Sequence, residues 1–153
     1  MIDSKFTDEK LLKILSLIDN REDTEIQKLV TDNADIPTIF EYVLGILWYK
    51  LSHRQSNVLD FMKLSLDVDL LPKTHAARDD ADIVYEYPTS ATYPAHSLLL
   101  EATLTERTNQ RRMEMEPVSR HLGNHILRTG NLNSYCLFAS NELNINVVSD
   151  FRG

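Results

Sequence analysis

The chain has 153 residues, of which 42% are hydrophobic and 25% are charged, as in ordinary globular proteins. Its formal net charge of −7 argues against a strong, autonomous nucleic-acid binder, because affinity for DNA depends largely on neutralising phosphates. It leaves room for a catalytic domain that another domain delivers to DNA. The single cysteine, Cys136, excludes an internal disulfide and suits a reducing cytoplasm, and no apolar run approaches the ~20 residues of a membrane span.

The first half of the chain shows helical patterns of apolar residues. Two short stripes within residues 8–33, separated by a break at 20–22, predict two helices. Residues 37–52 form the clearest helix, because their apolar residues keep helical spacing and Pro37 suits the first turn. The apolar residues of 57–72 settle on no single period, and we expect a short strand or an extended stretch there.

The second half alternates between strand and helix. Strand patterns cover residues 81–87, 96–104 and 133–139, and a helical pattern runs over 109–128. Another helical pattern begins near Asn144, shortly before the chain ends at Gly153, and we expect the natural protein to continue beyond that point. The alternation predicts an α/β fold.

Two acids, Asp82 and Glu101, lie on neighbouring predicted strands. A carboxylate in a largely apolar strand is costly to bury unless it is paired, protonated or bound to a cation. If the two strands pair as an antiparallel hairpin, the start of the first lies beside the end of the second, and both acids can ligate one divalent metal ion. Asp79 and Asp80 are rivals for Asp82, which we prefer because it lies closest to the strand.

A polar stripe follows the second of these strands. Helical rotation places Gln110, Glu114, Val118 and His121 along one side of the predicted helix. Pro117 would either kink this helix or mark the first turn of a second one. The stripe is either an ordinary solvated helix face or a set of polar groups turned toward the acids.

Glu41 is a further candidate on the predicted helix at 37–52, where it lies at the edge of the apolar stripe. It is either a glutamate at the rim of an amphipathic helix or an acid that reaches the carboxylate cluster. In the second case it would act as a metal ligand or through water.

Several segments together carry a resemblance to a known family. They resemble the cleavage domain of type IIS restriction and strand-nicking endonucleases with a PD-(D/E)XK fold, over roughly residues 36–150. The matching segments are 71–77, 82–86, 100–104, Gln110, Met113-Glu114, 116–121 and 135–138. The part from Glu114 to His121 is the most specific.

The resemblance implies the site residues. In enzymes of this kind, a strand aspartate, a glutamate of the next strand, a helix glutamate and a helix histidine form the active site. These roles fall on Asp82, Glu101, Glu114 and His121, with the first three as metal ligands. The family's earlier helix glutamate falls on Glu41, within Phe40-Glu41-Tyr42.

One position departs from the PD-(D/E)XK pattern. The pattern has a lysine two residues after the second acid, where this chain has Thr103. Such a lysine would orient and activate the attacking water, so Gln110 or His121 must substitute for it, or the metals must do more.

The resemblance also implies the fold and the function. We expect a central mixed sheet flanked by helices, with residues 1–36 as an N-terminal helical linker segment and 37–153 as the nuclease cleavage domain. The expected activity is Mg²⁺-dependent hydrolysis of double-stranded DNA, with Mn²⁺ as a substitute. A separate recognition domain would deliver the DNA, and a homo- or heterodimer would cut both strands. The alternative is a non-catalytic nuclease-fold module that dimerises with an active subunit.

Other patterns carry weaker chemistry. His121 and His125 have the spacing of two zinc ligands on a helix, but the glutamate that a metalloprotease needs after the first histidine is absent. Cys136 lies in an apolar strand and is expected in the core. Four arginines give residues 109–128 a basic character that suits either a solvated face or phosphate contacts: Arg111, Arg112, Arg120 and Arg128.

Overall fold

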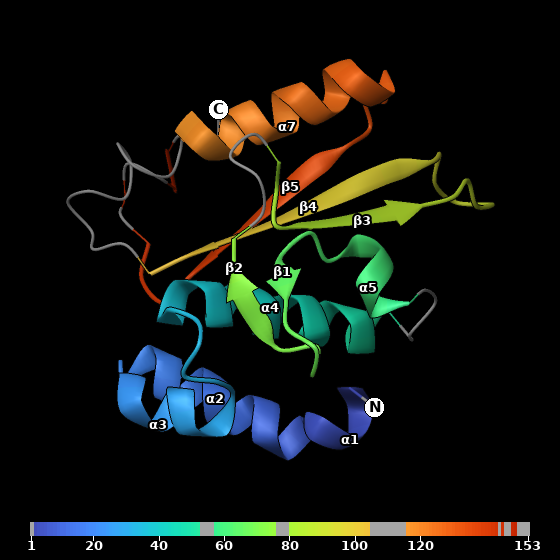
Figure 1. Cartoon of the computed structure of the whole chain (residues 1–153). Coiled ribbons are helices and arrows are strands. Elements are labelled where there is room, and N and C mark those ends of the chain that lie inside the picture. The colour runs from blue at the N-terminus through green and yellow to red at the C-terminus, as the bar shows by residue number, and fades with distance from the viewer. Residues whose placement is uncertain are drawn as a thin grey trace.

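The computed structural model of the chain describes residues 2–52, 57–75, 80–104, 116–143, 145 and 148–149. These residues form a layered α/β structure. A three-stranded sheet has helix α7 on one face and helix α4 on the other, with the N-terminal helices packed outside α4 (Figure 1). No helix in this described part is long and apolar enough to cross a membrane.

The N-terminal helices are α1 (Ile2–Lys5), α2 (Asp8–Asp19) and α3 (Asp23–Leu29). Thr7 caps α2, because its side chain accepts a hydrogen bond from the backbone N–H of Lys10. The break between α2 and α3 contains Arg21 in a left-handed conformation, with φ 54°. The two helices predicted within 8–33 are therefore confirmed, together with their break at 20–22, and α1 is an addition.

Apolar residues of these helices join one core with those of α4. The buried members from this part of the chain include Phe6, Leu11, Ile14, Ile18 and Ile26, and they cluster with Tyr42, Val43 and Ile46. The division of the chain at residue 36 stays a prediction.

Helix α4 (Ile36–Leu51) confirms the helix predicted at 37–52. Asp35 caps it by accepting a hydrogen bond from the Thr38 N–H at 2.9 Å. Gly45 lets the helix approach the sheet closely, because a Cβ there would lie 2.9 Å from Met62 Cε and 3.1 Å from Ile83 Cδ1. The helix is therefore held against the start of the strand that carries the first candidate acid.

Residues 57–75 differ in part from the expectation of a strand or an extended stretch over 57–72. They form a short helix, α5 (Val58–Phe61), and then strands β1 (Ser65–Leu66) and β2 (Pro72–Thr74), which pair antiparallel. The helix forms because Asn57 caps it and Phe61 packs on the ring of Tyr85, at a centroid distance of 4.4 Å. Strand β2 then runs back along α4.

The sheet has the order β3 (Ile83–Tyr87), β4 (His96–Thr103), β5 (Tyr135–Ser140). Strands β3 and β4 pair antiparallel, whereas β4 and β5 pair parallel across α7 (Glu116–Thr129). The three predicted strands and the mixed sheet are confirmed. Pro117 is the second described residue of α7, and the residues before Glu116 lie outside the described part, so both roles considered for it stay predictions.

Part of the expected C-terminal half falls outside the described residues. The first portion of the helix predicted at 109–128 lies there up to residue 115, as does Asn144, at the start of the last helical pattern.

Candidate active site

Asp82 lies immediately before β3, where its backbone is fixed on both sides. Its carbonyl oxygen accepts a hydrogen bond from the Lys63 N–H at 2.7 Å, and the next residue, Ile83, bridges to Met62. The side chain is buried. The strand start therefore holds a carboxylate in a defined and largely dry place.

Asp82 meets two side chains from other elements, Glu41 and His75. Glu41 comes from the buried side of α4, and His75 directly follows β2. One ligand atom from each of the three residues lies within 4.8 Å of the others, and His75 Nδ1 is 2.8 Å from Glu41 Oε2. We call these three residues the α4 cluster. Among the described residues, these three side chains are close enough together to hold a metal ion.

The ionisable groups of the α4 cluster shift one another's pKa. Burial raises the pKa of Glu41 to about 8, with the hydrogen bond from His75 acting against this rise and the nearby charge of Asp82 contributing to it. That hydrogen bond in turn raises the pKa of His75 to about 9, with the charges of Glu41, Asp82 and Asp35 adding to the effect. Two buried carboxylates that share one imidazole favour any further positive charge, including that of a metal ion.

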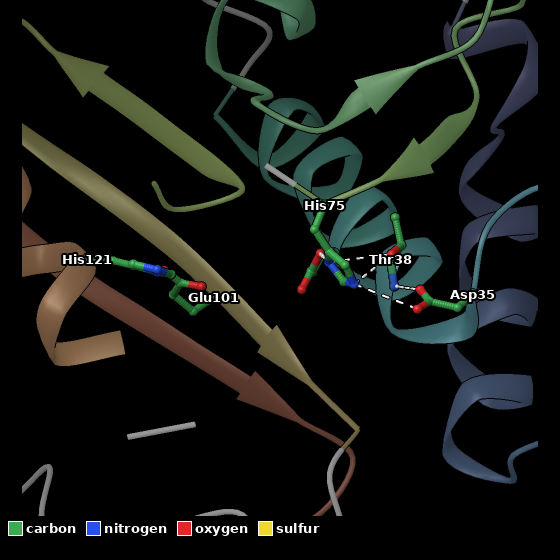
Figure 2. A network of polar contacts seen from close by, with 6 residues as sticks. Asp35, Thr38, His75, Glu101 and His121 are labelled. Atoms are coloured by element: carbon green, nitrogen blue, oxygen red, sulfur yellow. Dashed lines mark hydrogen bonds and ion pairs between the residues drawn. The ribbon is translucent and has the colours of Figure 1, made fainter. Parts of the chain in front are cut away.

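The far side of the His75 ring is held by the first turn of α4. Nε2 lies 3.0 Å from Thr38 Oγ1 and 3.7 Å from Asp35 Oδ2 (Figure 2). Asp35 is itself fixed as the cap of α4. Partial burial works against its ionisation, but hydrogen bonds from Thr38 and the positive charge of His75 lower its pKa. The ring is thus oriented by partners that are not in the cluster.

Glu101 and His121 form a second acid–histidine contact. Glu101 is buried on β4, and its Oε1 lies 2.7 Å from Nδ1 of His121 on α7. Figure 2 shows the two side chains pointing toward each other from these elements. The side chain of His121 is 13% exposed, against 47% for that of His75. We call these two residues the α7 pair.

The sequence-predicted residues therefore fall into two groups. Asp82 and Glu41 come together in the α4 cluster, and Glu101 and His121 come together in the α7 pair. Strand register bears out the expected hairpin, since Ile83 pairs with Leu100 and the next positions outward are Asp82 and Glu101. Glu101 is nevertheless not a member of the α4 cluster. Gln110 and Glu114 lie outside the described residues, so their roles stay predictions.

His75 is the residue of the site to which the sequence pattern gave no role. It occurs in one of the segments that carry the family resemblance. Its position directly after a strand and shortly before Asp82 is a signal, but only the pairing of β1 with β2 turns the ring toward Glu41.

The structure also shows the surroundings of the rival acid Asp80 and of the residues of the weaker motifs. Asp80 accepts a hydrogen bond from Arg128 at 2.8 Å, so it is paired with that arginine at the surface, while Asp79 lies outside the described residues.

His125 is 5% exposed, and its Nε2 has no hydrogen-bond partner among the described residues. Burial lowers the pKa of His125, and burial raises the pKa of the Cys136 thiol to about 12, with the charge of Glu101 adding to it. A thiol in that state is a poor nucleophile.

The chain is similar to known proteins both in sequence family and in structure. The family model described as "AlwI restriction endonuclease" matches residues 1–153. Among solved structures, the chain is similar to the small subunit (R.BspD6I2) of the heterodimeric restriction endonuclease R.BspD6I, with a TM-score of 0.62 and 21% identity. The match covers 89% of this chain and 62% of that subunit, so this chain spans less than two thirds of the subunit's length. At this identity the likeness shows the fold alone. No curated protein matches the chain.

Proposed function

The chain belongs to the AlwI restriction endonuclease family, and from that premise we propose that it is a metal-dependent nuclease domain that hydrolyses phosphodiester bonds of double-stranded DNA. The proposal includes a PD-(D/E)XK-type site in a type IIS or strand-nicking enzyme. The observation that carries it is the α4 cluster, in which two buried carboxylates from different elements converge with an imidazole. Carboxylates brought together in this way are stable when a cation compensates their charge.

The donor set fits a divalent cation such as Mg²⁺ or Mn²⁺, because carboxylate oxygens bind both ions. When bound, such an ion lowers the pKa of water and neutralises charge that develops on the phosphate. Asp82 would hold it, with Glu41 beside it, and we propose Glu101 and Glu114 as further ligands.

The α7 pair would transfer a proton or contact the phosphate. With Nδ1 protonated, His121 donates to Glu101, which fixes the ring's orientation and places Nε2 on the opposite side. We propose that Nε2 transfers a proton or contacts the phosphate. Thr103 is buried at the position of the family's lysine and offers no positive charge there. Gln110 would then help to position the attacking water.

Sequence-specific cleavage would need more than this chain. Its net charge of −7 repels DNA, so we propose that a separate domain recognises the sequence and delivers the substrate. The similar small subunit belongs to a heterodimeric enzyme, and this supports a partner subunit for this chain as well. Such an enzyme would act in the cytoplasm, where a chain with one cysteine needs no disulfide.

The second candidate function is a non-catalytic nuclease-fold module that dimerises with an active subunit. Thr103 favours it, because the lysine that activates water in the general pattern is replaced.

Plasmid cleavage tests the proposal against this alternative. The chain at high concentration, with Mg²⁺ or Mn²⁺, should convert supercoiled plasmid to nicked or linear DNA, and Asp82→Asn should abolish the conversion. If calorimetry shows metal binding and the plasmid stays intact, the non-catalytic module is the better account. If no metal binds, the metal-dependent mechanism is wrong.

A further inference from the structure

We propose that His75 is itself a metal ligand, and that its nitrogen makes the site prefer transition-metal dications such as Mn²⁺ to Mg²⁺. This inference rests on the proposed function, because it assumes that Asp82 and Glu41 hold a divalent ion. It adds a residue and a metal preference that the carboxylates alone do not provide.

The positions of the donor atoms suit shared coordination. Around an octahedral ion with bonds of ~2.1 Å, adjacent ligand atoms lie ~3 Å apart and opposite ones ~4.2 Å apart. Nδ1 of His75 is 2.8 Å from Oε2 of Glu41, and one atom each of Glu41, His75 and Asp82 lies within 4.8 Å of the others. The three side chains can therefore reach one ion with small adjustments.

The far side of the ring has the partners that a ligating histidine needs. Thr38 Oγ1 lies nearer to Nε2, at 3.0 Å, than to Nδ1, at 3.4 Å. Asp35 Oδ2 is 3.7 Å from Nε2, on a carboxylate that is anchored as the cap of α4. A metal-bound histidine commonly donates its other N–H to such a carboxylate or hydroxyl, which fixes the tautomer. With a metal ion on Nδ1, Nε2 would keep its proton and donate it toward Thr38 or Asp35.

The mixed donor set determines the metal preference. Mg²⁺ binds almost entirely through oxygen and keeps several waters, whereas an imidazole nitrogen suits transition metals. A site with two carboxylates and one imidazole should accept Mg²⁺ through its oxygens alone and gain an additional bond with Mn²⁺.

The competing role for His75 is that of a counter-charge that balances Glu41 and Asp82. The two roles predict opposite effects for His75→Ala. Removing a ligand lowers the affinity for Mn²⁺, whereas removing a positive charge beside two carboxylates raises the affinity for any cation. His75 is 47% exposed, so this substitution should leave the fold intact.

Isothermal titration of the full chain with MnCl₂ and with MgCl₂ measures the difference. The unchanged chain should bind Mn²⁺ more tightly than Mg²⁺, and His75→Ala should lose about 10- to 100-fold in Mn²⁺ affinity. The same variant should change Mg²⁺ affinity by less than about threefold. His96→Ala is the matched control, because His96 stacks between Tyr87 and Tyr135 at the other end of β4 and should change neither affinity.

Pulsed electron paramagnetic resonance of bound Mn²⁺ gives a second measurement. A nitrogen coupling should be present in the unchanged chain and in His96→Ala, and absent in His75→Ala. Unchanged or tighter Mn²⁺ binding by His75→Ala, with binding lost in Asp82→Asn, would overturn the role of His75 and leave the metal site standing. If the unchanged chain binds neither ion, the proposed function fails together with this inference.

Discussion

The α4 cluster and the α7 pair each join a histidine to a buried glutamate, at 2.8 and 2.7 Å, yet their surroundings differ. His75 is 47% exposed and has several acids around it, whereas His121 is 13% exposed and contacts Glu101. The first arrangement is open to ions from solvent and brings two carboxylates beside one imidazole. The second is enclosed and holds a ring in one orientation. We propose that these similar contacts serve different tasks, with metal binding at the α4 cluster and proton transfer or phosphate contact at the α7 pair.

Asp82→Asn should have the largest effect, because it removes a carboxylate on which the metal site depends. The cleavage rate should fall by more than about 100-fold, because mutating even a residue that only hydrogen-bonds to a metal ligand lowers metal affinity or activity by about 10- to 100-fold. The stabilisation of the native protein by Mn²⁺ in thermal melts should also disappear. Asp80→Asn is the matched control, because Asp80 pairs with Arg128 rather than with the cluster. Equal losses in both variants would contradict the assignment of Asp82.

His121→Ala should have the next largest effect, and on a different quantity. If His121 transfers a proton, single-turnover cleavage should slow by about 10²- to 10⁴-fold. Metal affinity should change little, because the ring contacts Glu101 without belonging to the α4 cluster. A rate near that of the unchanged chain would mean that the α7 pair is structural.

The metal-free protein should lose stability as the pH rises through the range in which the α4 cluster titrates. An unfolded chain ionises Glu41 near its usual pKa of 4.5, whereas the folded protein keeps this proton until pH about 8, so the folded state loses stability between these values. His75 adds stability below its usual pKa of 6.5, and this is lost as the pH rises through about 9.

Urea unfolding between pH 5 and 9, conducted without metal, measures this dependence. Glu41→Gln removes the acid and the partner of His75 together, so its profile should be flatter than that of the unchanged chain. If the free energy of unfolding depended on pH in the same way in both proteins, the α4 cluster would not be the cause of the loss of stability.

His125→Leu should have the smallest effect. His125 is buried on the same helix as His121, but its Nε2 has no hydrogen-bond partner among the described residues, so the polar group contributes little there. The free energy of unfolding should stay within about 1 kcal/mol of the unchanged value, or rise. Cleavage should persist, in contrast to His121→Ala. A large loss of activity would indicate that His125 belongs to the site.

Much of this arrangement could be predicted from local sequence. Residues 83–87 and 96–103 have the composition of strands, and their antiparallel pairing brings the ends that carry Asp82 and Glu101 together. Helix α4 was also predictable, because its apolar spacing is regular and Asp35 and Pro37 mark its start. These features depend on residues that are close in sequence.

The role of His75 could not be predicted in the same way. It depends on β1 and β2, which have two and three residues and are too short to show a period. Likewise, α5 has four residues and depends on the Asn57 cap and on the packing of Phe61 against Tyr85. Tertiary contacts decide both segments, and a single sequence does not display them.

Anomalous X-ray diffraction from crystals of the chain soaked in MnCl₂ tests the metal site most directly. The account predicts a strong peak within bonding distance of the Glu41 and Asp82 carboxylates, and no such peak in Asp82→Asn crystals. Manganese bound only at other acidic groups, with the α4 cluster unchanged between soaked and unsoaked crystals, would contradict it.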